Sequence, residues 1–198
     1  MKILALSDIH GDTVFMERMA EKGAQEHVDL VILAGDLLHF DQPKAGLIKP
    51  FKDKGLEVAI LPGNHEGMAE IGFMVEKYNA INLHGYAIRK GDIGIFGCGY
   101  GDIGLHQLNE EQFFTTLQKA HDSLSSVKKK LMVTHIQPSD SILGLGVFPG
   151  STGVRKAIEQ FQPDVHICGH IHETHGIEDK IGKTRSINVG KTGTIIEL

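Results

Sequence analysis

The residues best suited to chemistry in this chain are oxygen and imidazole donors that follow short apolar runs. In chain order they are Asp8 and His10, Asp36, Asn64 and His65, His135, and His170 and His172. Imidazole, carboxylate and amide donors without a thiolate suit one or two divalent metal ions of borderline hardness. Seven plausible ligands among these eight residues exceed the four of a closed structural zinc site, so with one bridging carboxylate they predict two ions with open positions for water. Asp36, which is central in the chain order of these residues, is the natural ligand to bridge the two ions.

Five buried strands are expected to position these side chains. The apolar runs 2–7, 29–34, 57–61, 130–134 and 164–168 each end abruptly in the polar residues. Near-continuous Val, Ile and Leu runs are typical of central strands that are buried on both faces. Because ligands bind beyond the carboxyl ends of the strands in open α/β sheets, we expect the polar residues to gather at one edge, the predicted active site.

Amphipathic segments between these runs predict four helices. Their apolar stripes lie within 15–23 behind an Asp12 cap, within 71–78, within 113–127 behind an Asn109 cap, and within 154–161 before Pro163. Further strands are expected over 81–89 and 92–98, and a hairpin that turns at 181–183 is followed by a last strand. No linker interrupts the pattern, so we expect residues 1–198 to form one α/β domain.

Composition excludes several classes of protein. The 198 residues carry 25 acidic and 20 basic side chains, a net charge of −5, with 128–130 as the one basic block, so no stable binding to duplex nucleic acid is expected. No apolar run approaches the roughly 20 residues of a membrane helix, and the first residues are too short for a signal sequence, so we expect a cytoplasmic protein without a membrane partner. Cys98 and Cys168 lack CxxC spacing and are expected to be isolated buried thiols.

Five short motifs, taken together and in order, resemble the motif set of calcineurin-like metallophosphoesterases. They are Asp8-Ile9-His10-Gly11, Gly35-Asp36, Gly63-Asn64-His65-Glu66, Thr134-His135 and Gly169-His170-Ile171-His172. The resemblance spans residues 1 to about 172, and the joint pattern is specific although each piece alone is weak. The fold that it implies is a four-layer αββα sandwich of two mixed β-sheets flanked by helices.

The resemblance also implies two ligand sets that share one residue. One ion would be held by Asp8, His10, Asp36 and His172, and the other by Asp36, Asn64, His135 and His170. Imidazole and carboxylate suit manganese, iron, cobalt, nickel and zinc alike, and manganese is our working choice for the two divalent cofactors.

His65 is implied as a catalytic residue beside the scissile phosphate, where an imidazole can stabilise transition-state charge or protonate the leaving oxygen. Asp36 acts through its bridging position, and Asn64 and His65 are expected to contact the substrate. Two-metal chemistry would convert a bound water to hydroxide, which attacks phosphorus in line. The predicted function is hydrolysis of phosphodiester, or phosphomonoester, bonds in small molecules or nucleotides.

Pro62 argues against two subclasses of the family. Ser/Thr phosphatases and dinucleoside tetraphosphate hydrolases that resemble this pattern carry Arg before the Gly-Asn-His-Glu stretch, where this chain has Pro62. A non-catalytic interaction scaffold with the same fold is the alternative from another class, and the intact ligand positions argue against it. Regulatory turnover of a cyclic nucleotide is a third hypothesis, which would need a pocket from loops 97–104 or 144–153. The sequence does not identify the physiological substrate, and it does not decide whether the chain forms a homo-oligomer.

Other histidines are expected to have surface or packing roles; they are His27, His84, His106, His121, His166 and His175. His39 and Asp41 are exceptions, because they follow Asp36 closely and the same loop could bring either to the rim of the site. The segment 99–104 matches G-x-G-x-x-G but does not lie in a first βα turn, so a dinucleotide site is disfavoured.

Overall fold

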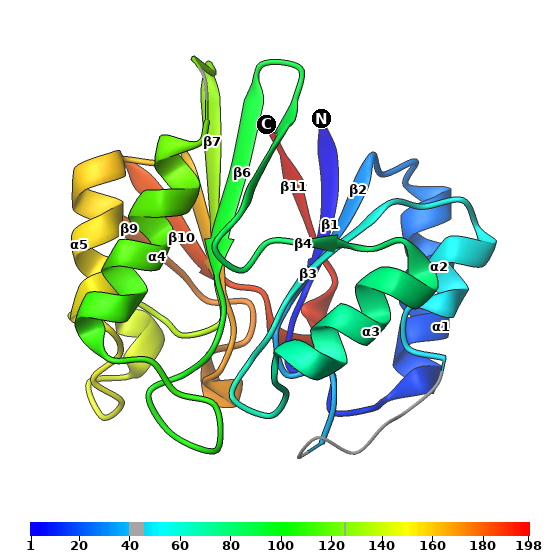
Figure 1. Cartoon of the computed structure of the whole chain (residues 1–198), viewed down its shortest axis with the longest axis horizontal. Coiled ribbons are helices and arrows are strands. Elements are labelled where there is room, and N and C mark those ends of the chain that lie inside the picture. Colours follow the sequence, from blue (N-terminus) through cyan, green and yellow to red (C-terminus); the bar gives the residue numbers. More distant parts are fainter. Residues whose placement is uncertain (40–45, 125) are drawn as a thin grey trace.

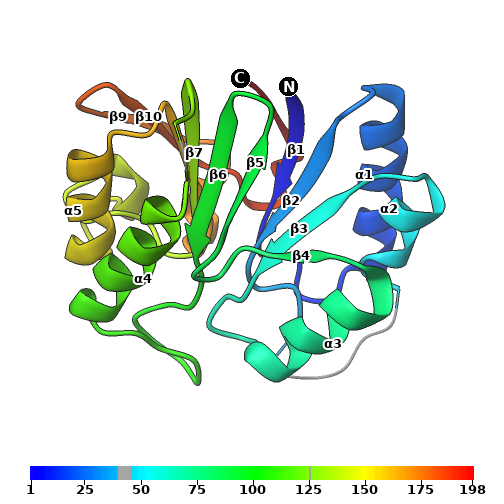
Figure 2. The same cartoon turned by 45° about the horizontal axis from the view of Figure 1, so that its top comes forward.

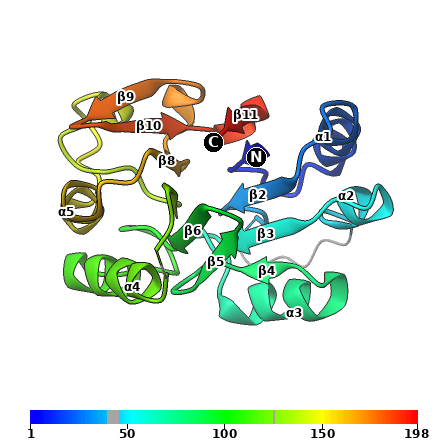
Figure 3. The ribbon, with the colours of Figure 1, turned by 90° about the horizontal axis from the view of Figure 1, so that it is seen from above.

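Two β-sheets packed face to face form the middle of the molecule, and helices cover both outer faces (Figures 1 and 3). The computed structural model describes residues 1–39, 46–124 and 126–198. The predicted four-layer αββα sandwich is therefore confirmed.

The first sheet has the strand order β11-β1-β2-β3-β4 within the described residues. Its strands are β1 Lys2–Leu6, β2 Leu30–Ala34, β3 Val58–Leu61, β4 Ile81–Asn82 and β11 Thr194–Glu197. The first four along the chain are parallel, and β11 pairs antiparallel with β1. This sheet is therefore mixed, with its one antiparallel strand at an edge.

The second sheet has the order β5-β6-β7-β8-β10-β9. Its strands are β5 Ala87–Lys90, β6 Ile93–Cys98, β7 Lys129–Thr134, β8 Val165–Cys168, β9 Glu178–Ile181 and β10 Thr184–Asn188. Strands β6, β7, β8 and β10 are parallel, whereas β5 and β9 are antiparallel edge strands. The hairpin predicted to turn at 181–183 is the β9–β10 pair.

The helices divide between the two outer faces, as Figure 2 shows from a second side. They are α1 Thr13–Gln25, α2 Lys49–Asp53 and α3 Met68–Tyr78 on the first sheet, and α4 Glu110–Asp122 and α5 Thr152–Phe161 on the second. The predicted caps are present, since the side chain of Asp12 accepts from the Phe15 N–H and that of Asn109 from the Gln112 N–H, both at 2.9 Å.

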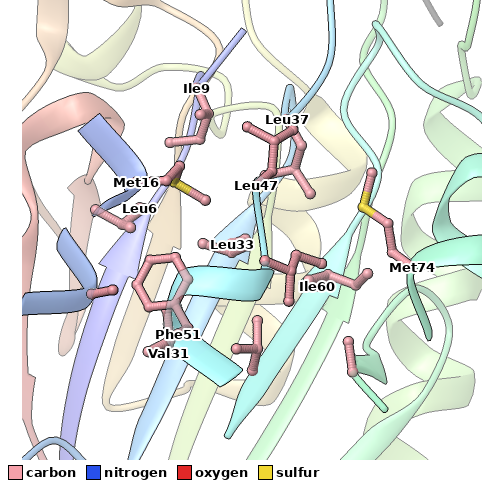
Figure 4. Packing of buried hydrophobic residues seen from close by; sticks show 14 of the residues in the cluster. Leu6, Ile9, Met16, Val31, Leu33, Leu37, Leu47, Phe51, Ile60 and Met74 are labelled. Carbon is pink, nitrogen blue, oxygen red and sulfur yellow. The ribbon is translucent and has the colours of Figure 1, made fainter. Parts of the chain in front are cut away.

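Alternation along the strands explains why both faces of the sheets are apolar. In β1, Ile3 and Ala5 point into the cluster between the sheets, while Leu4 and Leu6 point toward the helices. Figure 4 shows the apolar cluster between the first sheet and its helices, where Leu6, Val31 and Leu33 lie near Phe51 and Met16. Full burial of one such side chain contributes about 1.5–3 kcal/mol, so the central strands are held from both sides.

Two sequence predictions need correction. The expected strand over 81–89 is two short strands, because a turn with Gly85 at φ 74° carries the chain from β4 in one sheet to β5 in the other. The expected stripe over 113–127 is helical only to Asp122, and Leu124 and Val127 follow the helix and pack over Gly94 of β6. The short α2 has no counterpart among the predicted helices.

Candidate metal centre

The predicted site residues lie on loops that follow the carboxyl ends of β1, β2, β3, β7 and β8, at the lower edge in Figure 1. These strands belong to both sheets, so the edge is shared between them. Backbone hydrogen bonds join the loops: the Asp8 N–H donates to Gly35 O and the His10 N–H to Asp36 O, both at 3.0 Å, and the Gly169 N–H donates to His135 O at 2.9 Å. The geometry therefore confirms that the polar strand ends gather at one edge.

Four of the predicted ligands have left-handed backbone conformations. The φ angles are 57° at Asp8, 47° at His10, 52° at Asp36 and 72° at His170. For residues other than glycine this region costs roughly 1–2 kcal/mol. Such outliers concentrate at functional sites, where the surrounding structure holds them in place.

Two glycines leave the space that the carboxylates occupy. A Cβ atom at Gly63 would overlap the carboxylate of Asp36, and one at Gly169 would overlap Ser7 and the carboxylate of Asp8. The absence of a side chain at these two positions is what lets backbone and carboxylate approach so closely.

The first predicted ligand set converges. The Nε2 atoms of His10 and His172 lie 3.2 Å apart, and His172 Nε2 lies 3.6 Å from Asp8 Oδ1. His10 Nε2 is 3.8 Å from Asp36 Oδ2. The structure therefore brings together all four residues of this set.

Three residues of the second set also converge. His135 Nε2 lies 3.1 Å from Asn64 Oδ1 and 3.4 Å from Asp36 Oδ1. The Nδ1 of His135 donates to the carbonyl of Ala34 at 2.9 Å, which orients the ring with Nε2 toward the centre. The fourth residue, His170, lies beside this group with its ring centroid 5.1 Å from that of His135. Asp36 is thus shared, with Oδ2 toward the first set and Oδ1 toward the second.

Electrostatics favour a cation at this place. Asp8 and Asp36 are buried, and each has a ligand oxygen within 4.8 Å of the other and of a His135 nitrogen. Burial opposes their charge, yet the neighbouring imidazoles of His172 and His175 hold the pKa of Asp8 well below its usual value. Burial also opposes charge on His135, but Asp36 and Asp8 raise its pKa to about 10. Two buried carboxylates beside neutral oxygen and imidazole donors fit divalent ions.

Glu66 ties two of the site loops together. Its buried carboxylate accepts from the Gly63 N–H at 2.8 Å, the Leu38 N–H at 3.2 Å and the Leu37 N–H at 3.3 Å. Burial and the charge of Asp36 raise the pKa of Glu66 to about 7. In the sequence Glu66 is only one member of a motif, whereas in the structure it joins the loops after β2 and β3.

His65 lies over the shared carboxylate. Its backbone N–H donates to Asp36 Oδ1 at 3.1 Å, and its Nε2 is 3.7 Å from Asp36 Oδ2. The exposed ring of His39 stacks on His65 at 5.8 Å, so this residue reaches the rim of the centre. Asp41, the second rim candidate, lies outside the described residues.

Two further residues of the centre were missed by sequence reasoning. His175 Nε2 lies 3.5 Å from Asp8 Oδ2, and Asp102 Oδ1 lies 3.5 Å from His170 Nε2. The three-residue 3-10 turn His172–Thr174 brings His175 back to Asp8, and a loop after β6 brings Asp102. Neither has a sequence signal, because both approach through loops.

By contrast, His166 has a packing role in the core, where its ring is hydrogen-bonded to Thr134 and Ser186.

The chain belongs to the calcineurin-like phosphoesterase family, whose family model matches residues 1–174. An uncharacterized protein of Methanocaldococcus jannaschii is 27% identical over 200 residues, which cover 95% of this chain and 87% of that protein. An uncharacterized metallophosphoesterase of Helicobacter pylori is 24% identical over 87% of this chain, which spans 44% of that longer protein. Family membership supports metal-dependent hydrolysis of phosphoric esters, with divalent metal ions as cofactors.

Solved structures share the fold. A protein of Thermus thermophilus has a TM-score of 0.77 at 17% identity, covering 96% of this chain and 88% of that one. An archaeal phosphodiesterase has a TM-score of 0.59 at 18% identity, with coverage of 96% and 84%. A dimetal phosphatase from Danio rerio has a TM-score of 0.67 at 12% identity, with coverage of 98% and 88%.

No helix among the described residues is long and apolar enough to cross a membrane.

Proposed function

We propose that this protein is a binuclear-metal phosphoesterase that hydrolyses phosphodiesters of small molecules or nucleotides. The observation that carries the proposal is the convergence of two donor groups on opposite oxygens of Asp36, one through His10 and the other through His135. Membership of the calcineurin-like phosphoesterase family supports the reaction class. The structural likeness to a protein named as an archaeal phosphodiesterase favours the diester as the first substrate to test.

The proposed ligands divide as the family motifs suggest. One ion would be held by Asp8, His10, Asp36 and His172, and the other by Asp36, Asn64, His135 and His170. When bound, divalent ions lower the pKa of water toward neutrality and offset charge on phosphoryl oxygens. We take manganese as the first ion to test. Residues 1–198 are proposed to act as one domain, because the apolar cluster between the sheets joins strands of both.

The chain's own residues would orient the ester and handle its proton. His65, half-buried at the mouth of the centre, would stabilise charge on the phosphoryl group or protonate the leaving oxygen. Its backbone N–H holds Asp36 Oδ1 in place, so the position of His65 is tied to the bridging carboxylate. Asn64 offers a neutral amide beside His65, where it can contact both an ion and the ester.

The test compares two variants of the centre. We expect Asp36→Asn to lose bound metal and turnover together, because it removes the shared carboxylate. His65→Ala should retain metal and lose about 10²–10⁴-fold in turnover, the usual contribution of a general acid. His27→Asn serves as a control, since this exposed residue at the end of α1 has a left-handed backbone that asparagine accepts.

The assay measures hydrolysis of an aryl phosphodiester and of the matching monoester by chelator-treated protein, with and without added manganese, together with metal content. Faster turnover of the diester, dependent on metal and lost in His65→Ala, would support the proposal. Normal turnover by His65→Ala would overturn the role of that residue. No turnover of either ester by wild-type protein loaded with any of the candidate ions would favour the non-catalytic scaffold.

A further inference from the structure

We propose that Asp102 is a positioning residue of the metal centre, which holds the ring of His170 through its Nε2 and so presents Nδ1 to an ion. The inference rests on the proposed ligand role of His170. It adds to the centre a carboxylate that neither the family motifs nor the spacing of strand ends indicates.

The loop that carries Asp102 is fixed against the site. The Tyr100 N–H donates to Pro62 O at 2.8 Å, directly before the motif that contains Asn64. The loop is closed on itself, since the Leu108 N–H donates to Gly101 O at 3.1 Å. Both ends of the segment around Asp102 are thereby anchored.

The same loop packs directly on a proposed ligand. A Cβ atom at Gly101 would lie 3.1 Å from Asn64 Cβ, and one at Gly104 would lie 3.0 Å from Asn64 Nδ2. Gly104 also has a φ of 89°, which other residues rarely adopt. The two glycines bring the backbone against Asn64 and leave Asp102, between them, to reach across to His170.

The contact itself joins a largely buried imidazole to a partly exposed carboxylate. His170 Nε2 lies 3.5 Å from Asp102 Oδ1, and the two side chains are 8% and 31% exposed. A shift of roughly 0.5 Å would bring the pair to the usual N–H···O distance.

The neighbouring ligand shows the same arrangement with the opposite nitrogen. His135 donates from Nδ1 to the carbonyl of Ala34 and turns Nε2 toward Asp36 and Asn64. Metal-binding histidines generally donate their second N–H to a carboxylate or carbonyl, which fixes the tautomer and the ring orientation. In His170 the partnered nitrogen is Nε2, so the nitrogen left for an ion is Nδ1.

The experiment uses three variants of the full chain. Asp102→Ala removes the acceptor, whereas Asp102→Asn retains an oxygen that can accept the same hydrogen bond. Asp92→Ala is the matched control, because Asp92 precedes β6 at the end of the sheet opposite the loop and pairs with Lys128 on the surface. Thermal unfolding followed by circular dichroism verifies that each variant is folded.

The first readout is made without metal. In protein labelled with ¹⁵N at histidine, the imidazole shifts of His170, assigned by their loss in His170→Asn, report which nitrogen carries the proton. We expect the Nε2–H tautomer in wild type and Asp102→Asn, and a mixture of tautomers in Asp102→Ala. A His170 that is Nδ1–H in wild type would overturn the proposal.

The second readout is the affinity for manganese, measured by calorimetric titration of each variant. Loss of a partner that orients a ligand typically weakens metal binding 10–100-fold. We expect that loss in Asp102→Ala, recovery of most of it in Asp102→Asn, and no change in Asp92→Ala. Unchanged affinity in Asp102→Ala would overturn the proposal, and so would an Asn variant as weak as the Ala variant, since that would indicate direct ligation or a charge effect. Neither readout needs turnover, so a failure of the proposed role of Asp102 can be distinguished from a failure of the proposed hydrolysis.

Discussion

Replacement of Glu66 by alanine would remove the acceptor of three backbone N–H groups that lie away from solvent. The carboxylate receives the N–H groups of Leu37, Leu38 and Gly63, and Glu66 is fully buried. Each buried donor left without a partner costs about 1–3 kcal/mol, so we expect the loss of three partners in Glu66→Ala to lower the free energy of unfolding by about 3–9 kcal/mol. That is a large share of the roughly 5–15 kcal/mol typical of a folded domain.

The matched control is Glu70→Ala, four residues further along. Glu70 accepts a single N–H, that of Gly67 at 3.0 Å, at the start of α3. Loss of one capping bond costs about 1 kcal/mol. Urea unfolding of the metal-free proteins, followed by circular dichroism, measures both. If Glu66→Ala were within about 1 kcal/mol of Glu70→Ala, water would be satisfying the three N–H groups and the reasoning would be refuted.

The effect of the same variant on the free energy of unfolding should depend on pH. The folded-state pKa of Glu66 is about 7, above its ordinary value of 4.5, so between these values the folded chain keeps a proton that the unfolded chain releases. The contribution of Glu66 to stability is therefore full below 4.5, falls as pH rises to about 7, and is constant above it. This linkage corresponds to about 3 kcal/mol at most. The stability difference between wild type and Glu66→Ala should shrink over that window in metal-free protein.

Three other changes have defined outcomes. Because His135 must lose its proton to bind an ion and its pKa is raised to about 10, manganese affinity should increase with pH up to that value, which calorimetry at several pH values measures. A manganese affinity that does not change with pH would refute this. Burial lowers the pKa of His166 to about 3, so its contribution to stability is present above 6.5 and is lost progressively as pH falls toward 3; His166→Gln should remove this acid sensitivity in urea unfolding, and an unaltered acid response would contradict it. Gly169→Ala should abolish metal binding, because its Cβ would overlap Asp8 and Ser7, and normal metal content would show that the backbone can yield.

The strand ends can be predicted because strong local signals agree with the fold. The apolar runs that end before Asp8, Asp36 and His135 match β1, β2 and β7 to within a residue or two, since strands buried on both faces allow few polar residues. The sequence over 81–89 is misleading because apolar residues recur on both sides of Gly85, and only the turn at that glycine separates the two short strands. The five-residue α2 is too short to show helical periodicity.

The centre is predictable to the same extent as its strands. Its proposed ligands come directly after strands, so chain order alone places them at one edge. His175 and Asp102 enter from loops whose paths depend on tertiary contacts, such as the packing of Gly101 and Gly104 against Asn64. No period or spacing in the sequence encodes such an approach.

The left-handed backbone at four proposed ligands has a consequence for how mutations would be selected. Glycine at His10 or His170 would relieve roughly 1–2 kcal/mol of backbone cost at each position, whereas at Asp8 or Asp36 it would also remove a carboxylate that stabilises the charge of His135. A library sorted for abundance of metal-free protein should therefore enrich glycine at the two histidines, while a library sorted for turnover should deplete it there. At a core position such as Ile32 both screens should reject the same substitutions, so comparing the two rankings would separate residues kept for the fold from residues kept for the reaction.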